Sequence, residues 1–271
     1  MKTAASAFTS RIAVVGAAAT LISIGAPVRA DLKVVSDVAV TSSDKPAVRQ
    51  AVTTWFKGDM VRTETDRTIS LYDAKEQTIT TADKQRLIYR VTNLKNILSG
   101  NPGLMSRVQF NATASMEPKG DVKTIAGRLA HRYVGNASFS LSLDGLPAKS
   151  SPGTTMQIEQ WSVESLSAPA STSQMANPLL RISGPLQSMR GMEPLVKALA
   201  QVKGMPVSSR ISIVAKNADG SSKSPVVTTT DVISISEGSL SADLFKLPAG
   251  FHRVEPAPIP SAPGAAKIGA K

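Results

Sequence analysis

The chain contains no cysteine, and that absence removes several classes of protein. Without cysteine there are no disulfide bonds, no thiolate metal sites and no thiol to carry an N-terminal lipid. Histidine occurs only twice, at His131 and His252, and neither has a carboxylate or a second histidine at metal-ligand spacing. We therefore predict no metal site.

Motifs of common catalytic sites are missing as well. The chain has no Gly-x-Ser-x-Gly, no phosphate-binding glycine loop and no aspartate-rich calcium loop. Its carboxylates show no spacing that singles out a pair for acid/base chemistry. We predict that the protein is not an enzyme, that it has no catalytic residues and that it needs no cofactor. A hydrolase is the least favoured of the function classes considered.

Aromatic residues are scarce, at 4% of the chain, and no block of lysine and arginine occurs, which argues against a nucleic-acid partner. The net charge is nevertheless +11. Without Lys2, Arg11 and Arg29 the remaining chain has 28 basic and 20 acidic residues, a net charge of about +8. This charge favours anionic surfaces of the cell envelope, such as lipid head groups and polyanionic glycans. The alternative is that it only confers solubility.

Long apolar runs are also rare, and the one that exists lies at the N-terminus. Lys2 and Arg11 precede an alanine-rich apolar stretch from Ile12 to Ile24, and Val28-Arg29-Ala30 fits a small-residue cleavage site. This arrangement is typical of a secretory signal peptide. The apolar stretch is shorter than the ~20 residues that a spanning helix needs.

These features predict the domain organisation. Residues 1–30 form the signal peptide, residues 31–255 form a single domain, and residues 256–271 form a disordered tail rich in proline, alanine and glycine. The protein is expected to be periplasmic or secreted, and soluble once the signal is cleaved.

Short runs of β-prone residues follow one another closely, which indicates an antiparallel meander rather than alternating strands and helices. A turn at Lys119-Gly120-Asp121 is expected between two of them. The predicted strands are Asp31–Ser43, Val48–Phe56, Met60–Thr65, Ile69–Asp73, Thr78–Thr81, Arg86–Val91, Arg107–Ser115, Thr124–Val134, Met156–Val163, Val207–Ala215 and Pro225–Ser236.

The hairpin around Gly58-Asp59 is the most specific local signal. A Gly-X pair between two β-prone runs suits a two-residue type II′ turn. That turn would pair Phe56 with Val61 on one face of the sheet and Trp55 with Arg62 on the other. Which of the two faces is concave stays open at this point.

Helical spacing appears in one region. Leu179, Ile182, Leu186 and Met189 recur at intervals of three and four residues, as on one face of a helix. A second helix is expected to start near Pro194, to turn Leu195, Val196, Leu199 and Val202 inwards and to end with Gly204 at C′. Methionines gather here, at Met175, Met189, Met192 and Met205. They suit a surface that accepts varied apolar ligands, or ordinary core packing.

Two motifs carry a resemblance to a known family. They are the hairpin Lys57-Gly58-Asp59-x-Val61-Arg62 and the closing Phe245-x-x-Pro248-x-Gly250-Phe251. In this order, in an exported chain, they resemble exported domains of unknown function similar to the outer-membrane lipoprotein carrier (LolA-like) superfamily. The resemblance implies an α+β, mainly β fold, with a curled antiparallel sheet (an incomplete β-barrel) wrapped around a few helices. It also implies an apolar cavity on the concave side that accepts acyl chains.

The resemblance implies a periplasmic, non-enzymatic protein that binds or carries lipid, acyl or other apolar ligands, with a lipid or lipid-modified protein as partner. The alternative is a structural or interaction protein of the cell envelope, with a filled barrel and no ligand. The candidate ligand-lining residues are Phe56, Val61, Leu179, Ile182, Leu186, Met189, Met192, Leu195 and Leu199. Arg62 and Trp55 are candidates for a head-group or lid contact, since in lipoprotein carriers an arginine is thought to hold the lid through backbone carbonyls. Arg62 matches that arginine by position only.

Overall fold

A computed structural model of the chain describes residues 30–94, 108–143, 153–166, 191–217 and 221–255. The predicted signal peptide, the predicted tail and the first predicted helix lie outside these described residues. The statements below refer to the described residues.

The described residues form one sheet of twelve strands, in the order β12-β6-β5-β4-β3-β2-β1-β11-β10-β9-β8-β7. Neighbouring strands are antiparallel, except for the short β12, which runs parallel to β6. The strands are β1 (Asp31–Ser42), β2 (Lys45–Lys57), β3 (Met60–Glu64), β4 (Thr68–Asp73), β5 (Thr78–Asp83), β6 (Ile88–Asn93), β7 (Val108–Ile125), β8 (Arg128–Leu143), β9 (Gly153–Val163), β10 (Met205–Ala215), β11 (Val226–Gly238) and β12 (His252–Arg253).

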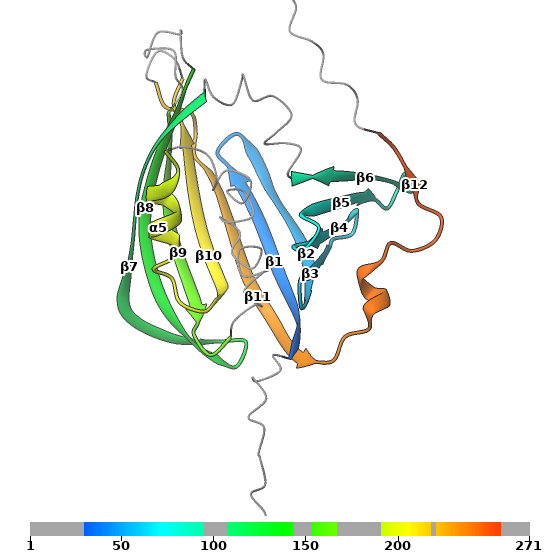
Figure 1. Cartoon of the computed structure of the whole chain (residues 1–271). Coiled ribbons are helices and arrows are strands. Elements are labelled where there is room, and N and C mark those ends of the chain that lie inside the picture. The colour runs from blue at the N-terminus through cyan, green and yellow to red at the C-terminus, as the bar shows by residue number, and fades with distance from the viewer. Residues whose placement is uncertain (1–29, 95–107, 144–152, 167–190, 218–220, 256–271) are drawn as a thin grey trace, which may run out of the picture.

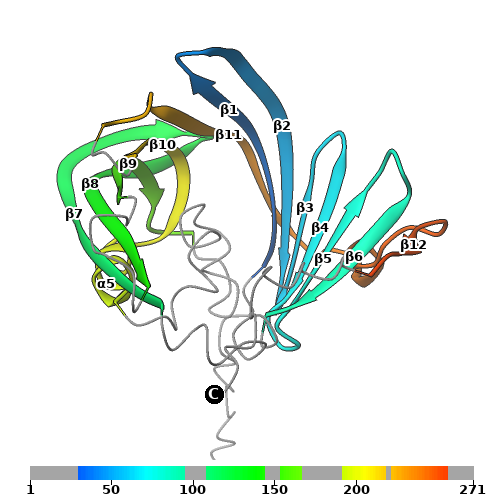
Figure 2. The same cartoon turned by 90° about the horizontal axis from the view of Figure 1, so that it is seen from above.

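The sheet is strongly curved but does not close into a barrel, because its edge strands β7 and β12 do not pair with each other. Viewed from above, β7 to β10 curl around one side and β1 to β6 form the other (Figure 2). Helix α5 (Glu193–Leu199) lies inside the curl, against β7 (Figures 1 and 2). The 3₁₀ helix η3 (Ala242–Phe245) contacts β3 and leads to β12 at the outer edge.

Alternation of side chains explains why these segments form strands of a one-sided sheet. In β9 the buried residues Met156, Ile158, Gln160 and Ser162 recur at every second position. Because successive side chains of a strand point to opposite faces, this pattern buries one face. The predicted strands are found within a few residues of their predicted bounds, apart from the pair at β7 and β8. Of the few helices predicted, one α-helix, α5, lies wholly within the described residues.

The hairpin between β2 and β3 is confirmed in detail. Phe56 pairs with Val61 and Trp55 with Arg62, as predicted. Gly58 has φ of 51° and Asp59 has a negative φ, which is the signature of a type II′ turn.

The predicted turn at Lys119-Gly120-Asp121 is wrong. These three residues lie inside β7, where the register shifts between Pro118 and Val122 and the extra residues form a bulge. The real turn is Ala126-Gly127, and both residues have positive φ, of 48° and 74°. A two-residue hairpin turn of type I′ needs this geometry at both positions. Lys-Gly-Asp has the stronger turn composition, so local sequence favoured the wrong site.

Helix α5 starts as predicted, with a proline in its first turn, but it ends earlier. Leu199 is its last residue and Ala200 its C-cap, so Gly204 is not at C′. Gly204 instead leads the chain into β10 with φ of 77°, where a Cβ would lie 2.2 Å from the carbonyl oxygen of Val163. Lack of room for a Cβ, rather than a role as helix cap, explains why a glycine stands there.

Candidate functional site

A groove lies on the concave face of the sheet, across β1, β2, β3, β10 and β11, and has a volume of about 270 Å³. Cross-strand register places its lining residues on the same face of the sheet as the residues that meet α5. Small-molecule sites usually have volumes of ~300 to ~1,000 Å³, so this groove is slightly smaller than that range.

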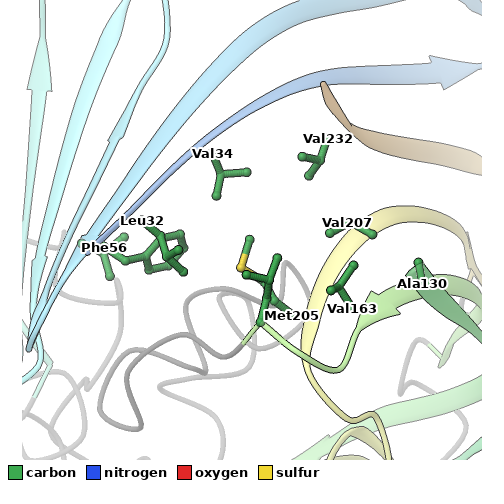
Figure 3. Packing of buried hydrophobic residues seen from close by; sticks show 10 residues of the cluster. Leu32, Val34, Phe56, Ala130, Val163, Met205, Val207 and Val232 are labelled. Atoms are coloured by element: carbon green, nitrogen blue, oxygen red, sulfur yellow. The ribbon is translucent and has the colours of Figure 1, made fainter. Parts of the chain in front are cut away.

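Apolar side chains form one part of the groove. Phe56 is 2% exposed and Val207 is 1% exposed, and both belong to a buried cluster that joins β1, β2, β10 and β11. Figure 3 shows how side chains from these strands gather on this face. The apolar residues that line the groove are Val34, Val38, Val52, Phe56, Met205, Pro206, Val207 and Val232.

The structure places the four residues of the first hairpin on opposite sides of the sheet. Phe56 lines the groove, and Val61 belongs to the same buried cluster. Their neighbours Trp55 and Arg62 point to the convex face, since side chains alternate along a strand. The concave side is therefore the side of Phe56.

On the convex face, Arg62 is 6% exposed and holds the C-terminal segment. Its Nη1 donates hydrogen bonds to the backbone carbonyl oxygens of Leu244, at 2.9 Å, and Lys246, at 3.3 Å. Its Nε and Nη2 donate to Oε2 of Glu64, at 3.1 and 2.6 Å. The guanidinium carbon lies 5.6 Å from the centre of the Trp55 ring. Arg62 therefore bonds backbone carbonyls, but those of residues around η3, on the face away from the groove.

The carboxylate of Glu64 completes this cluster and also accepts a hydrogen bond from Nζ of Lys84, at 2.8 Å. Burial alone would raise the pKa of Glu64, but the hydrogen bonds from Lys84 and Arg62 outweigh it and hold the pKa below its ordinary value of 4.5. The folded state thus favours the ionised form of this carboxyl.

This pKa shift predicts a loss of stability in acid. Because the folded-state pKa is lowered, the stabilisation by Glu64 is present above pH 4.5 and is lost as the pH falls through the folded-state value. We expect wild type to be more stable than Glu64→Gln at pH 7, and the difference to shrink below pH 4.5. Urea unfolding of both proteins at several pH values measures this. A difference that stays constant down to pH 3 would contradict it.

The helix α5 covers a second buried cluster, further along the concave face. Met192, Leu195 and Leu199 are at most 5% exposed and pack with residues of β7 to β10, including Ile158 and Ile211. They do not line the groove at Phe56. Leu179, Ile182, Leu186 and Met189, which were also predicted to line a cavity, lie outside the described residues. Of the clustered methionines, Met192 and Met205 are buried in different clusters, and Met175 lies outside the described residues.

The alternation of residues 156–163 placed Gln160 and Ser162 on one face of a strand, but sequence reasoning did not identify them as part of a buried polar set on the concave face. Gln160, Ser162 and Ser209 are at most 5% exposed, and Nε2 of Gln160 donates to Oγ of Ser162 at 3.0 Å. Thr54 and Thr63 face each other across β2 and β3, with their hydroxyl oxygens 3.3 Å apart. The sequence does contain a signal for them. Each lies an even number of positions from a buried apolar residue of its own strand, and therefore on the same face of the sheet.

The two histidines lie apart, on β8 and β12. Among the described residues, no three histidine, aspartate or glutamate side chains gather as a metal site would require. No helix within the described residues is long and apolar enough to cross a membrane.

Fold and groove together define a mainly β protein with an open, curled sheet and an uncharged groove on its concave face. No family model and no curated protein match the chain. Solved structures similar to it include a LolA superfamily protein, NE2245 from Nitrosomonas europaea (9% identity, TM-score 0.29, covering 81% of this chain and 91% of that one). A DUF1329 family protein from Desulfovibrio piger has 9% identity and a TM-score of 0.31, with the same coverage.

PNGF-II is also similar, with 10% identity and a TM-score of 0.33. That match covers 84% of this chain but 31% of PNGF-II, so the chain spans about a third of that protein. A LolA superfamily protein thus stands among the structures similar to this chain.

Proposed function

We propose that this chain is an exported, non-enzymatic protein that binds lipid or other apolar molecules in its concave groove. The observation that carries the proposal is the groove beside Phe56, in which apolar side chains alternate with uncharged polar ones. Burial of apolar surface yields ~25 cal/mol per Å², so a ligand gains affinity there without a metal, cofactor or catalytic group.

Two features of the sequence support a role in the cell envelope. The basic and apolar N-terminal stretch supports export to the periplasm or outside the cell. The positive net charge supports contact with anionic envelope surfaces, where lipid ligands are found. Carriage of a lipid or a lipid-modified protein between such surfaces would use both features.

Filling the groove should abolish binding. Val52 is half-buried on β2 and lines the groove opposite Ser36. A tryptophan there would occupy the space of the ligand. We expect wild type to bind the neutral fluorescent probe N-phenyl-1-naphthylamine, and Val52→Trp to bind it at least ~10-fold more weakly, which corresponds to about 1.4 kcal/mol. Fluorescence titration measures both affinities.

Ile233→Trp is the matched control, because Ile233 is 61% exposed on β11 and does not line the groove. This variant should bind the probe as wild type does, and circular dichroism should show that both variants are folded. If the folded wild-type protein does not bind the probe, the proposal is wrong, and the structural or interaction protein becomes the better hypothesis.

A further inference from the structure

We propose that the ligand of this groove is an uncharged amphiphile, and that Ser209 donates a hydrogen bond to its ester or amide carbonyl. The inference rests on the proposed function and narrows its ligand class. It excludes free fatty acids and other lipids whose charged group would have to enter the groove.

The first observation is the state of Ser209. This residue is 5% exposed and lines the groove, and its Oγ has no hydrogen-bond partner among the described residues. A serine hydroxyl offers one donor and two acceptor positions, and leaving it buried and unpaired is unfavourable. A carbonyl oxygen in the groove would satisfy this donor.

The second observation is a row of polar side chains across the sheet. Cross-strand register aligns Gln160 on β9, Ser209 on β10 and Thr230 on β11. The row continues through Val38 on β1 to Gln50 on β2. Neighbouring strands lie ~4.8 Å apart, so Gln160, Ser209 and Thr230 form a short polar row on the concave face, which the apolar Val38 separates from Gln50. Of the two neighbours of Ser209 in this row, Thr230 also lines the groove and offers a ligand a further polar partner.

The third observation is charge. Among the described residues that line the groove, none carries a charged side chain. The polar ones are Ser36, Gln50, Thr54, Thr63, Thr65, Ser208, Ser209, Thr228 and Thr230. A carboxylate or phosphate placed here would lose its hydration without gaining a counter-ion, which is strongly unfavourable. An ester or amide can use the same hydroxyl groups at far smaller cost.

The arrangement also indicates in which direction the acyl chain of the ligand would run along the groove. Val207 and Met205 follow Ser209 at two-residue steps back along β10, on the side where the buried cluster of Phe56 lies. At ~3.3 Å per residue, Met205 is about 13 Å from Ser209 along the strand. A carbonyl held at Ser209 would therefore let its acyl chain run along Val207 and Met205 towards Phe56.

The test compares an ester with its parent acid. Monopalmitoylglycerol and palmitate, each below its critical micelle concentration, compete with N-phenyl-1-naphthylamine for the wild-type protein and two variants. We expect the ester to displace the probe at about 10-fold lower concentration than palmitate, because the charged acid is excluded. Ser209→Ala should weaken displacement by the ester about 3- to 10-fold, as for one neutral hydrogen bond.

Ser212→Ala is the control, since Ser212 lies on the same strand and does not line the groove. It should leave displacement unchanged. Ser209→Ala should be at least as stable as wild type in urea, because it removes an unpaired buried hydroxyl. Equal displacement by ester and acid, or by the ester in wild type and Ser209→Ala, overturns this inference alone. Failure of the probe to bind at all overturns the proposed function, and this inference with it.

Discussion

Replacement of Gly204 by alanine should lower the free energy of unfolding by about 3–5 kcal/mol. Gly204 has φ of 77°, a left-handed conformation that costs an alanine ~1–2 kcal/mol. A Cβ would also lie 2.2 Å from the carbonyl oxygen of Val163 and 2.6 Å from the Cα of Glu164. Both contacts are with backbone, so β9 and β10 would have to move apart at the buried end of the groove.

Gly120 offers a control with nearly the same backbone conformation. Its φ is 75°, and nothing lies within 4 Å of its hypothetical Cβ. Gly120→Ala should therefore cost only the conformational part, ~1–2 kcal/mol. Urea unfolding of the two variants separates backbone strain from steric overlap. Equal losses of stability would show that the close approach of Gly204 to Val163 is relieved without cost.

Truncation of Phe56 to alanine should destabilise the protein by about 3–5 kcal/mol. The ring is 2% exposed and contacts the cluster formed with Leu32, Val34 and Val61. Its removal loses the apolar burial and leaves a cavity beside the groove. Chemical unfolding measures the change.

Trp55, its neighbour on the convex face, provides the comparison. Trp55 is only half-buried, and its ring lies under the guanidinium of Arg62. Trp55→Ala should cost less, about 1–2 kcal/mol, from partial burial and the cation–π contact. If Trp55→Ala were the more destabilising of the two, Phe56 would not be the main core residue of this hairpin. The face of the sheet on which we place the groove would then be wrong.

Much of the sheet is predictable because it depends on short-range patterns. The Gly58-Asp59 turn, the alternation in β9 and the proline that starts α5 are properties of a few consecutive residues. Turn geometry and side-chain alternation act over the same short range, so they identify strands and one exact register, that of Phe56 with Val61.

Prediction failed where a distant contact outweighs local preference. Lys119-Gly120-Asp121 has good turn composition, yet β7 continues through it as a bulge, and Asp121 pairs with Arg132 of β8 at 2.9 Å. Ala126-Gly127 makes the turn although alanine disfavours positive φ. The long pairing of β7 with β8 on both sides of the bulge stabilises this arrangement, and no local window of the sequence contains it.

The candidate site likewise combines features that the sequence predicts with features that only the folded structure reveals. The amino-acid sequence establishes that strands predominate, that Phe56 and Trp55 point to opposite faces and that no thiol chemistry is available. The concave side, the contact of Arg62 with Leu244 and the row from Gln160 through Ser209 to Thr230 emerge only on folding. The residues that line the groove come from segments far apart along the chain, and pairing of β1 with β11 together with the curvature of the sheet brings them together, whereas Arg62 meets Leu244 on the opposite face.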